Sequence, residues 1–272
     1  MLTATDITVS INGARLLDQV SVAFAPGRLS IVVGPNGAGK STLVKVLARH
    51  LRPQAGVVRY GGRPLAAWNE RDLAKARAVL SQNVALAFPL RVREVVLMGR
   101  YPHFTGAPGP RDQRACTEAM RYFDVIDWAE RNYLTLSGGE RQRVQFARVM
   151  AQIWDPIPDG HRYLLLDEPL TFLDIRYQFD FLRRVRSLLT GGDLVAVGVV
   201  HDLNLAARFA DHVVLLSHGR VLAAGPPPEV CRADLIEEAF GIRPVVQMAP
   251  NGRVHLLFGD EPDASVLPAH VS

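Results

Sequence analysis

The fold of this chain is decided by the stretch Gly34-Pro35-Asn36-Gly37-Ala38-Gly39-Lys40-Ser41. It matches the pattern G-x-x-x-x-G-K-[ST], in which a glycine-rich backbone wraps a phosphate group. The short predicted strand Leu29–Val33 precedes it, and Leu43, Val46 and Leu47 follow it at helical spacing. A strand, a glycine-rich loop and a helix start in this order predict a phosphate site at the helix N-terminus.

Two side chains of this loop indicate a nucleotide with its metal ion. Lys40 can reach the β- and γ-phosphates, and the Ser41 hydroxyl can ligate Mg²⁺. Thr42 directly follows and is counted with the binding loop. An ordinary glycine-rich turn is the alternative, but a chance match to every fixed position is rare in 272 residues. ATP and Mg²⁺ are therefore the expected ligands.

Carboxylates follow a second apolar run. The segment Tyr163–Leu166 leads directly into Asp167 and Glu168, and the run Leu194–Val200 ends at His201. Open α/β sheets bind ligands at the carboxyl ends of their strands. Asp167 is predicted to hold Mg²⁺, Glu168 to orient and deprotonate the attacking water, and His201 to contact the γ-phosphate. As isolated residues, a polar strand end and a solvated histidine remain the alternatives.

The order of predicted elements indicates an α/β protein with inserted segments. Helical patterning dominates from Val92 to Ile153, apart from a Pro/Gly stretch, and a helix is expected over Ile175–Leu189 between two buried parallel strands. A last strand is expected over His212–Ser217, and the tail after Gly259 has few apolar residues. The remaining expected strands are Leu2–Val9, Leu16–Phe24, Leu29–Val33 and Val57–Tyr60.

Composition excludes several classes of protein. The chain is long enough for one large or two small domains, and its two cysteines, Cys116 and Cys231, show neither a disulfide pattern nor metal spacing. The 31 basic and 27 acidic residues give a net charge of +4 without a basic block, so no nucleic-acid partner is expected. We find neither a signal peptide nor an apolar run of membrane-spanning length.

A helix start with anion-binding chemistry lies between the two groups of motifs. Ser137 and Glu140 form the S-x-x-E capping box, with Gly138 and Gly139 between them. The simple interpretation is a capped helix N-terminus. Two glycines at such an N-terminus also leave an unobstructed approach for an anion.

Together these motifs resemble the ATP-binding subunit of ABC transporters over essentially Met1 to Phe240. The resemblance implies a P-loop NTPase with a RecA-like core, an N-terminal antiparallel β subdomain and an inserted α-helical subdomain at about residues 88–153. Residues 1–240 would form the ATPase domain. Residues 241–272 would form a C-terminal extension, to which the resemblance assigns no role.

The resemblance also implies that two copies of the chain share each ATP. Leu136–Glu140 is similar to the family's signature motif, so Ser137, Gly138, Gly139 and Glu140 would contact ATP bound by a partner copy, together with Asp174 of the D-loop. Gln82 resembles the Q-loop glutamine that touches Mg²⁺ or water and couples to the membrane subunits, and His201 resembles the switch histidine.

One position departs from the family pattern. The family usually stacks adenine on an aromatic residue, and the matching residue here is Ile11. Our hypothesis is that the guanidinium plane of Arg15 replaces it. A solvated hairpin arginine is the alternative.

Two segments indicate the type of transporter. Val92–Phe104 is similar to importers of chelated iron and cobalamin, and the insertion Ala151–Arg162 is similar to heme-import ATPases, although a variable surface loop is the alternative. The resemblance implies a peripheral subunit on the cytoplasmic face of the bacterial inner membrane. Its expected partners are a second copy, two transmembrane permease subunits and, indirectly, a periplasmic binding protein.

Other functions remain as alternatives. Siderophore or cobalamin uptake would use the same machinery as heme uptake. A non-transport ABC ATPase usually has two cassettes or a coiled-coil insert, and a module that binds ATP without hydrolysis could lose Glu168 or His201, which are both present.

Overall fold

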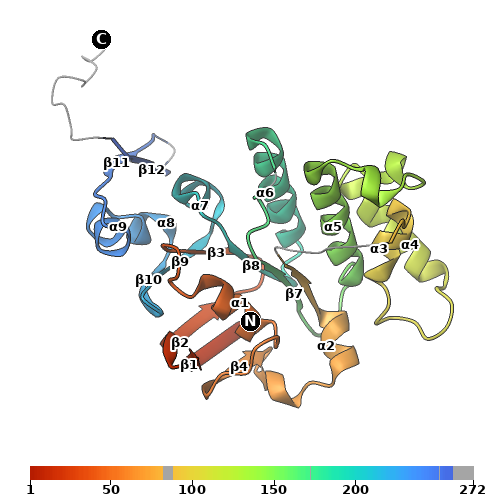
Figure 1. Cartoon of the computed structure of the whole chain (residues 1–272), viewed down its shortest axis with the longest axis horizontal. Coiled ribbons are helices and arrows are strands. Elements are labelled where there is room, and N and C mark those ends of the chain that lie inside the picture. Colours follow the sequence, from red (N-terminus) through yellow and green to blue (C-terminus); the bar gives the residue numbers. More distant parts are fainter. Residues whose placement is uncertain (82–87, 172, 251, 260–272) are drawn as a thin grey trace, which may run out of the picture.

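The computed structural model describes residues 1–81, 88–171, 173–250 and 252–259, and Figure 1 shows their arrangement. The predicted α/β class is confirmed. The strands are β1 (Leu2–Ile11), β2 (Ala14–Phe24), β3 (Leu29–Val33), β4 (Ala55–Tyr60), β5 (Arg63–Pro64), β6 (Arg77–Leu80), β7 (Arg162–Leu166), β8 (Leu194–Val199), β9 (His212–Ser217), β10 (Arg220–Gly225), β11 (Val245–Met248) and β12 (Val254–Leu257). The α-helices are α1 (Lys40–Leu47), α2 (Glu70–Ala76), α3 (Val92–Met98), α4 (Pro110–Tyr122), α5 (Gly138–Gln152), α6 (Ile175–Leu189), α7 (Leu203–Phe209), α8 (Pro227–Val230) and α9 (Ala233–Phe240). Short 3-10 turns are η1 (Leu65–Ala67), η2 (Ile126–Trp128) and η3 (Tyr133–Thr135).

A six-stranded sheet in the order β10-β9-β3-β8-β7-β6 forms the centre of the molecule. All its neighbouring pairs are parallel except the β9–β10 pair at one edge. Strands β3, β7 and β8 are buried at every residue, which explains why their sequences are apolar except at Ser30, Arg162 and Gly198. Because these strands run parallel, the loops that follow them all emerge at the same edge of the sheet, the one formed by the carboxyl ends of the strands.

Alternating residues of the central strands feed two separate cores. In β7, Leu164 and Leu166 belong to the core shared with the helices α3 to α6, whereas Tyr163 and Leu165 belong to the core shared with α1 and the β1–β2–β4 layer. This follows from the two-residue period of a strand, whose successive side chains point to opposite faces. The central sheet is therefore covered on both faces.

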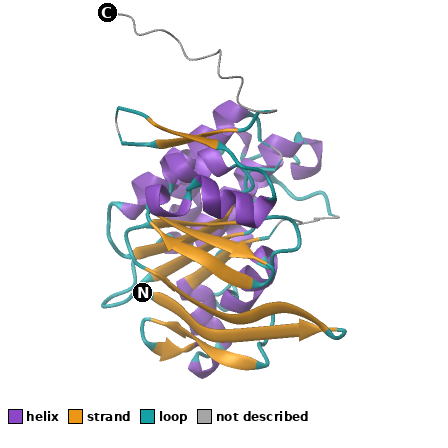
Figure 2. Cartoon of the chain, turned by 90° about the vertical axis from the view of Figure 1, so that its left-hand side faces the viewer, coloured by secondary structure: helices purple, strands orange, loops and turns teal. Residues whose placement is uncertain are grey.

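The second sheet, ordered β2-β1-β4-β5, is antiparallel and lies below α1 and the central sheet in Figures 1 and 2. Its strands alternate buried and exposed residues, as expected when one face packs on a core. Helix α1 turns Leu43 and Leu47 into the core that it shares with both sheets. The helix that follows the phosphate loop is thereby held between two layers.

The helical segment between β6 and β7 contains α3, α4 and α5 and lies at the right of Figure 1. The rings of Phe146 in α5 and Phe181 in α6 stack with centroids 3.8 Å apart, which joins this segment to the core. Arg100 is 1% exposed and donates to Asp112, to Asp155 and to the carbonyl of Ala151. The insertion at Asp155 is thus fixed to the helical segment by a buried cation.

The structure corrects the sequence-based prediction at the C-terminal end. His212–Ser217 is a strand but not the last one, because β10, α8, α9 and the hairpin β11–β12 follow it. The tail beyond residue 259 lies outside the described residues. Within the described ranges, no helix combines the length and the apolar character needed to span a bilayer.

Candidate active site

Two glycines shape the predicted phosphate loop between β3 and α1. Gly34 has φ 151°, and a Cβ at this position would lie 2.1 Å from the carbonyl oxygen of Leu216. Gly39 has φ 99°, and its Cβ would lie 2.6 Å from the carbonyl oxygen of Leu16. The backbone could not pack this closely with side chains at either residue. The fixed glycines of the pattern therefore have a steric cause in this chain.

Lys40 is the first residue of α1 and points back over the loop. Its ammonium group donates to the carbonyl oxygens of Gly34 and Pro35, both at 2.8 Å. The residue is 5% exposed, and burial lowers the pKa of Lys40, while the nearby carboxylates of Glu168 and Asp167 oppose this shift. A buried cation thus stands at the position where a phosphate would enter.

Ser41 and Asp167 form an oxygen pair beside this cation. The Ser41 hydroxyl donates to Oδ1 of Asp167 across 3.0 Å, which joins the first turn of α1, where Thr42 also lies, to the end of β7. Burial raises the pKa of Asp167, and the hydrogen bond from Ser41 opposes the rise. A hydroxyl and a carboxylate at this distance are the hard oxygen ligands that Mg²⁺ prefers, so the residues present fit this ion.

Glu168 and His201 form a second pair at the same edge of the sheet. Nε2 of His201 lies 2.9 Å from Oε1 of Glu168. Glu168 has φ 53°, a left-handed conformation that costs a non-glycine residue energy and concentrates at functional sites. The structure therefore brings together Lys40, Ser41, Asp167, Glu168 and His201, as the sequence predicts.

A cavity of about 210 Å³ opens beside Glu168 and His201. Its wall includes three polar residues that sequence reasoning missed, namely Thr171, Gln178 and Asp202. The Gln178 amide donates to the carbonyl oxygens of Leu170 and Leu173, so it fixes the loop that connects β7 to α6. In the sequence, the only signal for these three polar residues is that they lie close to Glu168, Asp174 and His201.

The predicted capping box at the start of α5 is present. The amide of Glu140 donates to the Ser137 hydroxyl at 3.3 Å, and the amide of Ser137 donates to the Glu140 carboxylate at 2.8 Å. This backbone hydrogen bond is the main cause that lowers the pKa of Glu140. Gly138 and Gly139 form the first turn. The Gln142 amide also donates to the carbonyl of Pro169 at 2.8 Å, so α5 is tied to the loop after Glu168.

The structure gives less direct evidence for the roles of the other predicted residues. Asp174 caps α6 by accepting from the amide of Tyr177. Arg15 is 62% exposed at its side chain and pairs with Asp18 at 2.9 Å, while Ile11 is 44% exposed. Gln82 lies outside the described residues.

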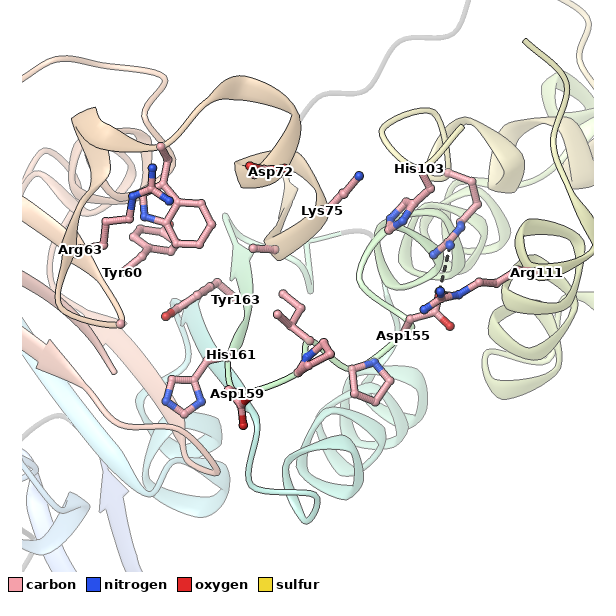
Figure 3. A pocket seen from close by; sticks show the side chains of 18 of the residues that line it. Tyr60, Arg63, Asp72, Lys75, His103, Arg111, Asp155, Asp159, His161 and Tyr163 are labelled. Carbon is pink, nitrogen blue, oxygen red and sulfur yellow. Dashed lines mark hydrogen bonds and ion pairs between the residues drawn. The ribbon is translucent and has the colours of Figure 1, made fainter. Parts of the chain in front are cut away.

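A larger cavity of about 770 Å³ lies at the other end of the central strands, where β7 begins, next to the insertion before β7 (Figure 3). Tyr60, Tyr163 and His161 line it, and Arg111 pairs with Asp155 on its far side. Among the residues that the structure describes, none of those predicted for the phosphate, the metal or catalysis lines this cavity. Volume alone therefore does not mark the reaction site of this chain.

Comparisons with known proteins agree with this geometry. Residues 17–171 match the family model described as ABC transporter. The chain is 51% identical over 250 residues to the hemin import ATP-binding protein HmuV of Gloeobacter violaceus, covering 92% of this chain and 90% of that protein. It is 42% identical over 241 residues to the protein of the same name from Escherichia coli O157:H7, covering 89% and 92%.

Solved structures share the fold. A metal-chelate type ABC transporter in an inward-facing conformation superposes with a TM-score of 0.80 at 23% identity, over 95% of this chain and 97% of that one. The ADP conformation of an ATP-binding cassette gives a TM-score of 0.76 at 18% identity, over 89% and 97%. With a phosphate loop, a strand-end carboxylate pair and a histidine at one sheet edge, this chain belongs to the ABC transporter family and is an ATP-binding ATP hydrolase.

Proposed function

We propose that this chain is the ATP-hydrolysing subunit of an importer that carries heme across the cytoplasmic membrane. The observation that carries the proposal is the meeting of two pairs, Ser41 with Asp167 and Glu168 with His201, beside the Lys40 ammonium. The relatives named hemin import ATP-binding protein cover about nine tenths of the chain and support heme as the cargo.

In the proposed reaction, the Lys40 ammonium group gives up its hydrogen bonds to the two loop carbonyl oxygens and binds the β- and γ-phosphate oxygens of ATP instead. Ser41 and Gln82 would hold Mg²⁺, and Asp167 would hold the ion through a water molecule. The ion neutralises charge on the phosphate oxygens when it is bound. The other residues Gly34 to Gly39, together with Thr42, surround the phosphates.

Glu168 is the proposed general base. It accepts a proton from the attacking water, the oxygen of that water bonds to the γ-phosphorus, and the bond from the γ-phosphorus to the bridging oxygen breaks to give ADP and phosphate. His201 holds Glu168 through the 2.9 Å contact and contacts the γ-phosphate. Arg15 is the proposed face on which adenine stacks.

We propose that two copies share two ATP molecules. Ser137, Gly138, Gly139 and Glu140 of one copy then close over ATP held by Lys40 of the other, with Asp174 beside them. The capped N-terminus of α5, whose first turn contains two glycines, supports this role, because helix N-termini favour anions.

The permease subunits dock on the surface that leads into the helical segment. Phe88 is 73% exposed and Tyr101 is 59% exposed, and Tyr101 packs edge-on against Phe104 with ring centroids 5.9 Å apart. Exposed aromatic residues of this kind mark protein contacts. The chain itself is then peripheral on the cytoplasmic face, and a periplasmic binding protein delivers the cargo from the other side.

Reconstituted transport complexes test the cargo. We expect a hemin-loaded periplasmic binding protein to stimulate phosphate release by the complex in vesicles, with the empty binding protein as control. Ferric-siderophore and cobalamin binding proteins serve as matched controls for cargo class. Stimulation by either of these, and none by the hemin-loaded protein, would replace heme with that cargo and leave the ATPase assignment intact.

A further inference from the structure

The loop that follows Glu168 is held by glutamine side chains from two helices. The Gln142 amide of α5 donates to the carbonyl oxygen of Pro169 at 2.8 Å. The Gln178 amide of α6 donates to two later carbonyl oxygens of the same loop, at 3.1 and 3.3 Å. Helices α5 and α6 both pack into the core that they share with one face of the central sheet, so the loop is attached to fixed elements on both sides.

The hydrogen bond from Gln142 lies directly beside a strained residue. Glu168 has φ 53°, and such a conformation persists only where the surrounding contacts hold it. Pro169 is buried, and in the part of the chain that the structure describes no donor other than the Gln142 amide reaches its carbonyl oxygen. His201 contacts the carboxylate of Glu168 at 2.9 Å, while Gln142 holds the backbone at the next residue.

Gln142 belongs to the helix whose N-terminus is assigned to the other ATP. It lies in the second turn of α5, two residues after Glu140, whose amide donates to the Ser137 cap at 3.3 Å. Under the proposed function, that N-terminus closes over ATP held by a second copy. The half-buried side chain of Gln142 instead reaches the loop beside Glu168 of its own copy.

We propose that Gln142 is a positioning residue for hydrolysis of the ATP held by its own copy. Its hydrogen bond to Pro169 fixes the backbone from which the Glu168 carboxylate reaches the attacking water. The inference rests on the proposed function, in which Glu168 is the base and two copies share two ATP molecules. Displacing a reacting group by about 1 Å can cost about 10²-fold in rate, so a bond that fixes the base affects turnover without contacting the nucleotide.

A variant without the amide donor tests this role in the full chain. Gln142→Met keeps a side chain of similar length and leaves the Pro169 carbonyl without its donor. We expect kcat for phosphate release to fall about 10-fold, while ATP affinity measured by titration calorimetry stays the same. Gln113→Met, at an exposed residue of α4, is the matched control. An unaltered kcat for Gln142→Met, or a loss of ATP affinity at unaltered kcat, would overturn the inference.

The placement of the same change separates an action on the base from an action on the partner's ATP. A chain with intact Glu168 is mixed with a large excess of the Glu168→Gln chain, so that each working base lies in a mixed pair. The first burst of phosphate release is then measured with ATP and Mg²⁺, and the rate of the excess chain alone is subtracted. Gln142→Met is introduced either into the chain with intact Glu168 or into the Glu168→Gln chain.

We expect the burst to be about 10-fold slower when the change lies in the chain with intact Glu168, and unaltered when it lies in the Glu168→Gln chain. Equal slowing in both placements, or slowing only in the second, would overturn the inference, because Gln142 would then act on ATP held by the other copy. A burst that neither placement slows overturns it too. The mixture without any change at Gln142 is the reference, and a missing burst there would contradict the proposed sharing of ATP itself.

Discussion

Lys40 begins α1 with its ammonium group held by two carbonyl oxygens of the loop before it. Both bonds involve a charged donor, and hydrogen bonds to charged groups contribute about 1.5–3 kcal/mol each. Removing the ammonium group deprives a bound triphosphate of the same interactions. Lys40→Ala should therefore lower ATP affinity about 10- to 100-fold, as measured by titration calorimetry. Lys45→Ala, on the same helix, is the control, and equal affinity in both variants would remove Lys40 from the phosphate site.

Asp167 carries a carboxylate that burial disfavours, so its charge lowers the stability of the empty protein. Its pKa is raised above the unfolded value of 3.8, and stability therefore falls as pH rises through the window between these two values and stays lower at neutral pH. Asp167→Asn keeps an acceptor for Ser41 and removes the charge. The thermal midpoint at pH 7 should therefore rise above that of the unchanged chain.

The same variant should lose most Mg²⁺-dependent hydrolysis, because a neutral amide is a poor ligand for the ion. A lower thermal midpoint at pH 7 would contradict the account of the buried charge. Unimpaired hydrolysis would contradict the metal role.

The site residues differ in how far the sequence could predict them. Lys40, Ser41, Asp167 and Glu168 are found because each has a fixed place next to a glycine-rich loop or a buried strand. His201 follows from the end of a third such strand. Gln178 carries no such signal, since it lies within α6 and reaches the cavity only through its bonds to the preceding loop.

At the scale of elements, burial on both faces made β3, β7 and β8 predictable, and their expected bounds agree with the structure to within a residue. The hairpin β11–β12 was not predicted. Its first strand has no buried residue at all, so it shows no alternation of apolar and polar side chains. Its position depends on Asn204, which is 52 residues from Leu256 in sequence, and local patterns contain no such information.

The insertion before β7 is held by a buried ion cluster rather than lying free on the surface. Arg100 binds both Asp112 and Asp155, and removal of one partner of a buried pair costs about 3–5 kcal/mol. Arg100→Ala should therefore lower the free energy of unfolding in urea by about that amount. Arg114→Ala, a more exposed residue near the same cluster, is the control. A loss below about 1 kcal/mol would mean that the cluster does not stabilise the insertion.

At the scale of the whole molecule, docking to the permease can be separated from hydrolysis. A charge on the exposed aromatic surface should disrupt an apolar contact without touching the phosphate site. Phe88→Asp and Tyr101→Asp should each abolish co-purification with the permease subunits, while the isolated subunit keeps its ATPase rate. Ala23→Asp on the opposite layer should behave as the unchanged chain. Retained co-purification in both variants would move the docking surface elsewhere.

The central claim is that Glu168, beside His201 and opposite the Ser41–Asp167 pair, is the base for hydrolysis of ATP held at this edge of the sheet. Phosphate release by Glu168→Gln, measured together with ATP binding on the same sample, tests it most directly. General-base catalysis contributes about 10²-fold or more, so release should fall by at least about that factor while ATP affinity is retained. Phosphate release at a near-normal rate in this variant would contradict the account.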